Sequence, residues 1–289
     1  MAKDVALVLS SGGARGLAHI GAIEELESQG YRITSIAGCS MGALIGGVYA
    51  AGKLVEFREW MKTVDRKKML ELTDFSLSLN HIVKGTRIIE AIMEFVPDMP
   101  IEDLPIPYCA VATDWKAGRE VVLCKGSLFE AIRASISLPS FYEPVQRDGM
   151  ILIDGGVTNP IPMNRVARHN GDIMVAVDVS GHDYKAQSDV QHELAERRKR
   201  STSLSQQILN KLIPDNLDFN YYTMLSRVSS LMIRQNSILM AQLMKPDVLV
   251  DIQMSRYGSF DFDKSEKLIA IGRQKTLQAL SEFIEKRPL

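Results

Sequence analysis

A serine between small residues stands where the sequence predicts a strand that turns into a helix. The turn is Gly38-Cys39-Ser40-Met41-Gly42, a G-x-S-x-G pattern. Small residues allow a sharp turn with strained backbone angles, which lifts the serine hydroxyl above the end of the sheet. The helix that follows directs its first N–H groups and the positive end of its dipole to the same place. Ser40 is therefore the candidate nucleophile, and Gly38 and Gly42 support its turn.

Two other interpretations of this turn stay open from the pattern alone. The small residues could simply pack a helix closely against the sheet. The thiol of Cys39 could also be the nucleophile. Neighbouring side chains point in different directions, so only one of them can occupy the tip, and the G-x-S-x-G pattern favours Ser40.

A glycine-rich loop lies between the first predicted strand and the first predicted helix, with the sequence Ser10-Ser11-Gly12-Gly13-Ala14-Arg15-Gly16. Glycines here let the backbone turn its N–H groups toward a shared anion, as in an oxyanion hole. A dinucleotide-binding loop is the rival interpretation. Ser11 replaces the first glycine of that fingerprint, and no acidic residue follows the second strand to hold a ribose. A phosphate-binding P-loop would need a Gly-Lys-Ser/Thr sequence, which this loop lacks.

The third candidate cluster is Asp154-Gly155-Gly156, at the end of an apolar stretch that predicts a strand. A carboxylate at the C-terminal end of a sheet strand lies where α/β folds place their active sites. The two glycines would let another part of the backbone come close. An Asp-Gly pair is also common in ordinary turns, so a purely structural role stays open for Asp154.

Alternating strands and helices are predicted to position these clusters. Residues 5–9 and 33–37 form strands, and helices follow each of them, at 17–26 and up to about 52, as in a parallel α/β sheet. Residues 183–245 form a helical insertion before the last strand, which could act as a lid. The remaining predictions are strands at 108–113, 120–123, 150–153, 173–178 and 248–252, and helical segments at 53–100, 127–135 and 264–286.

Composition and charge limit the class of protein. The 289 residues are 46% hydrophobic and 24% charged, with a formal net charge of −1, so nothing global indicates a nucleic-acid partner. The uncharged residues 36–52 fall short of the roughly 20 that a membrane-spanning helix needs. The three cysteines are widely spaced and fit a reducing compartment. With no signal-peptide pattern at the N-terminus, we expect a cytoplasmic protein.

The three clusters together resemble the bacterial patatin-like phospholipases, which share a Ser-Asp dyad fold with plant patatin. A fourth block, Ala134-Ser135-Ile136-Ser137-Leu138-Pro139, is similar to the Ala-Ser-x-x-x-Pro segment of that family. The likeness covers residues 5–180 in motif order and resumes near 260–263. It implies one patatin-like domain over residues 1–289, with three α/β/α layers around a mainly parallel sheet.

The resemblance also implies roles at the matching positions. Ser40 would be the nucleophile and Asp154 its base, with no cofactor and no metal. Backbone amides of Gly12, Gly13 and Ala14 would form the oxyanion hole. Arg15 would support that loop or meet a phosphate, and Gly155 and Gly156 would support the aspartate. The sequence departs from the family at Ser11, where glycine is usual, and at Cys39, where threonine is common.

A Ser-Asp-His triad is the alternative to a dyad. His169 and His182 both follow Asp154, which is the chain order of α/β-hydrolases. His169 lies in a segment that predicts an exposed helix end, and His182 begins a polar segment. His19 is expected to be structural. If Asp154 is the sole base, its burial should raise its pKa toward neutrality.

These observations predict a phospholipase, lysophospholipase or carboxylesterase that cleaves lipid or small acyl esters through an acyl-enzyme. The alternative is a non-catalytic or regulatory member of the same fold with a gated site. The apolar stretch 217–243 could be a lid, an acyl channel, a peripheral membrane contact or a homodimer face. The basic run Arg197-Arg198-Lys199-Arg200 has acidic neighbours, which favours a solvated surface over a lipid or acidic partner.

Overall fold

A mixed sheet of eight strands forms the centre of the computed structural model, which describes residues 3–72, 86–139, 141–181, 221–253, 257–258 and 261–286. The strand order is β5-β6-β3-β2-β1-β7-β8, and β4 pairs with β3 beside this path. The strands β1, β2, β3, β7 and β8 run parallel, whereas β4 and β6 run antiparallel to β3. The bounds are β1 Lys3–Leu9, β2 Tyr31–Cys39, β3 Tyr108–Asp114, β4 Arg119–Leu123, β5 Val145–Arg147, β6 Met150–Asp154, β7 Ile173–Gly181 and β8 Val248–Gln253.

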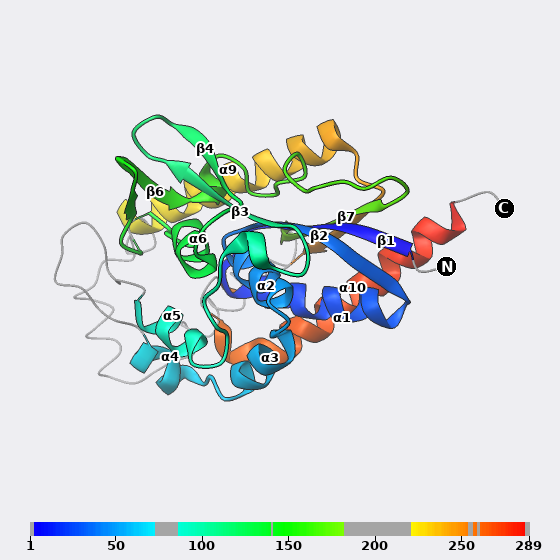
Figure 1. The fold of residues 1–289 in the computed structure, drawn as a ribbon, viewed down its shortest axis with the longest axis horizontal. Coiled ribbons are helices and arrows are strands. Elements are labelled where there is room, and N and C mark those ends of the chain that lie inside the picture. The colour runs from blue at the N-terminus through cyan, green and yellow to red at the C-terminus, as the bar shows by residue number, and fades with distance from the viewer. Residues whose placement is uncertain are drawn as a thin grey trace, which may run out of the picture.

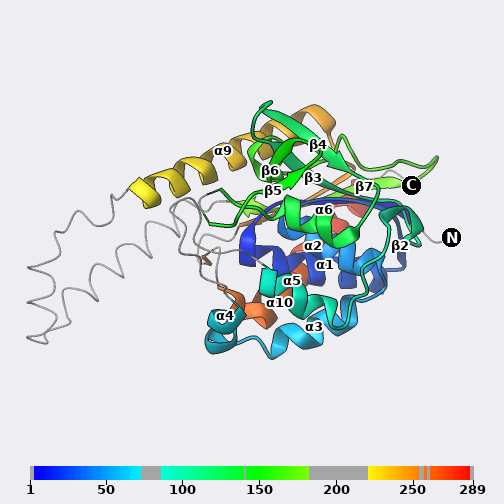
Figure 2. The same ribbon diagram turned by 60° about the vertical axis from the view of Figure 1, so that its left-hand side comes forward.

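Helices cover both faces of this sheet, which gives the predicted three layers. Figure 1 shows α1 (Ala18–Ser28), α2 (Met41–Ala50) and α10 (Ser265–Glu285) on one face and α9 (Tyr221–Met244) on the other. Figure 2 shows the same separation from a second direction. The first layer is extended by α3 (Leu54–Lys62), α4 (Arg66–Leu72), α5 (Thr86–Met93) and α6 (Leu128–Ser135).

The central strand β1 shows how the sheet holds two cores. Its residues Val5, Leu7 and Leu9 belong to the large apolar cluster under α1, α2 and α10. The alternate residues Ala6 and Val8 belong to a smaller cluster on the opposite face, where Met240 and Ala241 of α9 pack. Because strand side chains alternate between faces, a continuous apolar run is what a strand covered on both sides requires.

Most predicted elements are confirmed, and the predicted strands at 108–113 and 120–123 pair antiparallel as β3 and β4. The segment 53–100 contains three separate helices, α3, α4 and α5. The strand β5, which pairs with β6, was not predicted because three residues carry too little periodicity. Within the predicted insertion 183–245, α9 is described, and residues 183–220, with the basic run at 197–200, lie outside the described residues. None of the described helices is both long and apolar enough to cross a membrane.

Candidate active site

Ser40 occupies the tip of a tight turn between β2 and α2. Its backbone has φ 54° and ψ −119°, so it is one of the few described non-glycine residues with positive φ. This conformation costs on the order of 1–3 kcal/mol, and the surrounding structure must hold it. The sequence expectation of a strained serine elbow is therefore matched by the backbone of the structure.

The small residues around the serine are required by close backbone contacts. A Cβ on Gly38 would lie 2.5 Å from the carbonyl oxygen of Gly42 and 2.6 Å from Cα of Ala43. A Cβ on Gly42 would overlap the carbonyl group of Leu9. The two glycines thus let α2 start directly against the ends of β1 and β2, as expected for this turn.

A buried serine of α6 holds the main chain of the elbow. The N–H of Ser40 donates to Oγ of Ser135 (2.8 Å), and that hydroxyl donates to the carbonyl oxygen of Val111 on β3 (2.6 Å). Ser135 is fully buried. Sequence reasoning noted the block 134–139 but assigned no role to Ser135, because a contact across 95 residues leaves no local pattern.

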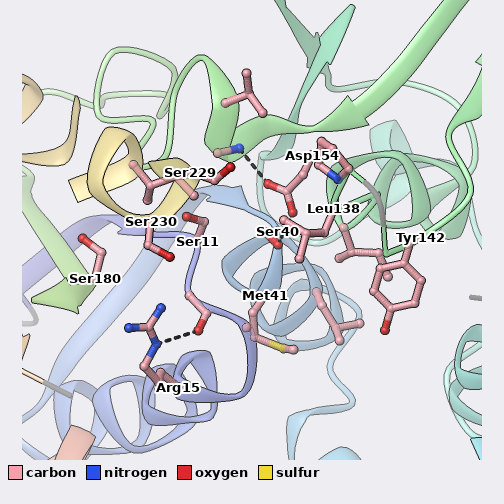
Figure 3. Close-up of a pocket in the computed structure, with 18 of the residues that line it drawn as sticks. Ser11, Arg15, Ser40, Met41, Leu138, Tyr142, Asp154, Ser180, Ser229 and Ser230 are labelled. Atoms are coloured by element: carbon pink, nitrogen blue, oxygen red, sulfur yellow. Dashed lines mark hydrogen bonds between the residues drawn. The ribbon is translucent and has the colours of Figure 1, made fainter. Parts of the chain in front are cut away.

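The carboxyl group of Asp154 lies against the serine hydroxyl. Oγ of Ser40 donates to Oδ2 of Asp154 (2.6 Å), and the other oxygen, Oδ1, accepts from the N–H of Gly156 (2.7 Å). The main chain of Asp154 is also fixed, because its N–H donates to Ser137 and its carbonyl accepts from Thr113. Figure 3 shows Asp154 and Ser40 next to each other.

Asp154 is the last residue of β6, at the C-terminal end of a strand as predicted. The sequence did not indicate the direction of this strand, which runs antiparallel to β3. The last residue of β2, Cys39, pairs with Val111, and Asp154 pairs with Ala112, the next residue of β3. Asp154 therefore approaches from beyond the end of β2, because β3 is long enough to hold both neighbours.

Burial changes the acid–base chemistry of this carboxyl group. Asp154 is only 4% exposed, and its desolvation raises its pKa from the ordinary value of 3.8 to about 6, against the lowering effect of its hydrogen bonds from Ser40 and Gly156. A carboxylate with this pKa is still ionised at neutral pH and is a stronger base than an exposed one. The expected rise in pKa is thus present.

The glycine loop lies beside the pair. Gly12 and Gly13 line the same cavity as Ser40. Gly13, whose φ is 58°, begins a short 3₁₀ helix, Gly13–Leu17. The first N–H groups of such a helix have no partner within it and can point at an anion. Ala14, the third predicted amide, is fully buried and is not among the residues that line the cavity.

Arg15 lines the cavity and also braces the loop. Its Nε donates to the carbonyl oxygen of Gly12 (3.1 Å), as Figure 3 shows. Desolvation lowers the pKa of this guanidinium, and the charge of Asp178 acts in the opposite direction. Arg15 is thus placed to support the loop, and its role there or toward a phosphate stays a prediction.

The two glycines after the aspartate allow close packing at the site. A Cβ on Gly155 would overlap the carbonyl group of Val111. A Cβ on Gly156 would lie 3.0 Å from Oδ1 of Asp154, 3.2 Å from Oγ of Ser11 and 3.4 Å from Cδ1 of Ile233. Gly156 thus lets the glycine loop and α9 come close to the aspartate.

The histidines considered for a triad are not brought to Ser40 by the described structure. His169 lies in an exposed turn rather than at a helix end, and its N–H donates to Asp172 near the start of β7. His19 is fully buried, with Nε2 2.9 Å from the carbonyl oxygen of Ser10, and burial lowers its pKa to about 4. Neither lines the cavity, and His182 lies outside the described residues.

The cavity around Ser40 measures about 240 Å³ and has two chemically different sides. Ser11, Arg15, Ser180 and Ser230 gather on one side of Ser40 in Figure 3. The other side is lined by apolar side chains, which include Leu44, Ile88, Ile89, Ile92, Ile136 and Leu138. Among the described residues, no group of His, Cys, Asp and Glu side chains is arranged to hold a metal ion.

The sequence agrees with a known family over most of these elements. The model of the family described as patatin-like phospholipase matches residues 7–167, which is more than half of the chain. The chain belongs to this family. The match includes the glycine loop, the elbow, Ser135 and Asp154, so the resemblance inferred from the four motifs is confirmed.

Two relatives illustrate the range of this patatin-like family. An uncharacterized NTE family protein of Mycobacterium tuberculosis is 46% identical over 203 residues, which are 69% of this chain and 56% of that protein. Neuropathy target esterase sws of Drosophila melanogaster is 32% identical over 188 residues, which are 63% of this chain and 13% of that protein. The chain thus spans about half the length of the mycobacterial relative and a small part of the esterase.

A solved structure gives a weaker likeness. VipD from Legionella pneumophila superimposes with a TM-score of 0.48 at 14% identity, over 98% of this chain and 67% of that chain. The patatin-like fold rests on the family match and on the sheet itself.

The two departures from the patatin-like pattern fit the structure without distortion. Ser11 is not among the described non-glycine residues with positive φ, so a side chain is tolerated there, and its N–H donates to the carbonyl oxygen of Pro160. Cys39 is fully buried, and burial raises its pKa well above the ordinary value, which disfavours the thiolate. The thiol is therefore poorly suited to act as the nucleophile.

Proposed function

We propose that the chain is a serine acyl-hydrolase that cleaves acyl esters of lipids through Ser40, Asp154 and an acyl-enzyme intermediate. The observation that carries this proposal is the 2.6 Å hydrogen bond between Oγ of Ser40 and Oδ2 of Asp154, at the tip of the strained elbow. Membership of the patatin-like phospholipase family and the esterase name of the Drosophila relative support the reaction class. The apolar side of the cavity suits an acyl chain.

In the first half of the reaction, Asp154 acts as the general base. Its Oδ2 takes the proton of Ser40 as Oγ attacks the carbonyl carbon of the ester. Negative charge moves to the carbonyl oxygen, where N–H groups of Gly12 and Gly13 would stabilise it. When the intermediate collapses, the protonated Asp154 gives its proton to the departing alcohol, and the acyl group stays on Ser40.

The second half repeats these roles with water. Asp154 takes a proton from a water molecule that attacks the acyl-enzyme, and the same loop amides stabilise the second oxyanion. The bond from Oγ to the acyl carbon then breaks, and the proton returns to Ser40 as the fatty acid leaves. Each half-reaction leaves Asp154 ionised, so no histidine is needed to complete the cycle.

Hydrolysis of a chromogenic fatty-acyl ester tests this proposal with four proteins. Wild type should turn over the ester, and Ser40→Ala and Asp154→Asn should each lose at least about 10³-fold in kcat/KM. His169→Ala is the matched control for the triad alternative and should keep the wild-type rate. Loss of activity in a folded His169→Ala protein would favour the triad.

The non-catalytic alternative predicts a different result in the same assay. A folded wild type that neither hydrolyses the ester nor reacts with a fluorophosphonate would contradict the proposal and support a gated site. The departing alcohol would leave toward the serine-rich side of the cavity; it is the lysophospholipid when the substrate is a phospholipid, the glycerophosphodiester when it is a lysophospholipid, and a small alcohol when it is a simple ester. A panel of these esters therefore identifies the substrate class.

A further inference from the structure

A second, smaller cavity adjoins the apolar side of the active-site cavity. It measures about 20 Å³, about the space of one water-sized sphere, and every side chain that lines it is apolar. The wall of the small cavity away from the active site includes Phe57 and Trp60 of α3 and Val64, which follows α3. Because this space offers no hydrogen-bond partner, it suits a methyl or methylene group better than a water molecule.

The two cavities share part of their walls. The side chains that line both are Met41, Leu44, Ile88, Ile92 and Phe262. Phe262 is the largest of these and is 7% exposed, just before α10 begins. The shared side chains thus form a thin apolar partition, and a smaller side chain in it would join the two spaces.

The chemistry of the active-site cavity orients an ester within it. The carbonyl oxygen must lie at the glycine loop, and polar groups such as Arg15 and Ser230 stand on one side of Ser40. The helices α2 and α5 contribute apolar side chains to the lining, such as Leu44 and Ile92, and Tyr142 lies on the side opposite the serines in Figure 3. An acyl chain bound on this side would therefore contact the shared side chains, of which Phe262 is the largest.

We propose that the space between α2 and α5 holds a single acyl chain and that Phe262 sets the longest chain it accepts. This inference rests on the proposed acyl-hydrolase function. The cavity of about 240 Å³ is small for a ligand site, whose usual range is ~300–1,000 Å³, and this size suits one acyl chain. Chain length is then limited where the apolar cavity ends, at the partition.

Three variants test the role of Phe262. Phe262→Leu keeps an apolar residue but should join the small cavity to the large one. Phe283→Leu is the matched control, since the same substitution in α10 touches neither cavity. Val64→Leu, at a position that lines only the small cavity, should have no effect alone but should reverse part of the Phe262→Leu effect when the two are combined.

The readout is the binding of octanoate and palmitate, the fatty-acid products, measured by calorimetry. Phe262→Leu should raise the palmitate-to-octanoate affinity ratio by about tenfold, the scale of a methylene in an apolar pocket, and Phe283→Leu should leave it unchanged. An unchanged ratio in a folded Phe262→Leu protein, or no fatty-acid binding at all, would overturn the inference. Product binding needs no turnover, so a protein that binds as expected but hydrolyses nothing would contradict only the proposed function.

Discussion

At the scale of single residues, the proposed mechanism depends on a carboxylate that is buried at an energetic cost. Asp154 gains hydrogen bonds from Ser40 and Gly156, yet its pKa still rises to about 6. Desolvation therefore exceeds these favourable contacts. The same burial that makes Asp154 an effective base also makes its ionised form unfavourable in the folded protein.

We predict that Asp154→Asn abolishes hydrolysis and stabilises the protein at neutral pH. Between pH values of about 4 and 6, the folded state binds more protons at Asp154 than the unfolded state, so stability falls as pH rises through this window. The pKa rise from 3.8 to about 6 corresponds to up to about 3 kcal/mol. Urea unfolding of both proteins at pH 4 and pH 7 measures the difference, which should be small at the lower pH. A variant that is less stable at pH 7 would contradict this prediction.

Ser11 allows a prediction about the departure from the family pattern. Its hydroxyl is buried and has no hydrogen-bond partner among the described residues, and its backbone does not need glycine. Ser11→Ala should therefore keep the rate of ester hydrolysis and raise the free energy of unfolding by about 1 kcal/mol. A marked loss of kcat in Ser11→Ala would show that the hydroxyl takes part in the reaction.

At the scale of elements, α6 fixes the elbow through Ser135. Ser135→Ala removes the acceptor of the Ser40 N–H and leaves the carbonyl of Val111 without this donor. We expect kcat to fall by about tenfold or more, because a displaced nucleophile loses its alignment, with KM little changed. Ser35→Ala is the control, since Ser35 is equally buried on β2 and donates to Ala167. Similar stability losses of about 1–3 kcal/mol, with full activity only in the control, would support a positioning role.

The guanidinium of Arg234 links α9 to two strands of the sheet. Arg234 contacts Asp178 of β7 (3.0 Å) and Asp251 of β8 (3.3 Å), and its neighbour Ile233 lines the cavity. Arg234→Gln would leave Asp178 buried without its cation, so we predict a loss of about 2–4 kcal/mol in unfolding free energy and a higher KM. The unfolding free energy and the KM of Arg234→Lys should lie between those of the wild type and of Arg234→Gln. Wild-type KM in Arg234→Gln would show that α9 does not shape substrate binding.

The sequence was most informative where local chemistry repeats along the chain. The apolar run of β1 and the G-x-S-x-G turn are each recognisable from a few consecutive residues, so the strand and the elbow could be predicted. The direction of β6 and the contact of Ser135 with Ser40 depend on pairings between distant segments, and these leave no local periodicity. The small cavity behind Phe262 likewise depends on how α2, α3 and α5 pack.

At the scale of the whole molecule, the site is assembled from both halves of the chain. Residues 7–167, which match the family, carry Ser40, Asp154 and the glycine loop. The elements after them, α9 and the segment before α10, contribute Ile233 and Phe262 to the cavity. The reacting groups thus belong to the shared part of the fold, and part of the substrate-facing wall comes from the remainder.

The outer face of α9 exposes apolar side chains that could contact a partner. Val228, Leu239 and Leu243 are 46%, 52% and 75% exposed on this helix. A peripheral membrane contact and a homodimer interface therefore both stay predictions for this face. The expectation of one domain over residues 1–289 also stays a prediction.

The rate at which a fluorophosphonate labels Ser40, measured against pH and located by peptide mass spectrometry, tests the central claim most directly. The adduct should lie on Ser40, and the rate should rise about tenfold per pH unit below about pH 6 and level off above it, as the carboxyl group of Asp154 loses its proton. Asp154→Asn should label slowly and without this dependence. An adduct elsewhere, or a pH profile that survives Asp154→Asn, would contradict the Ser40–Asp154 dyad.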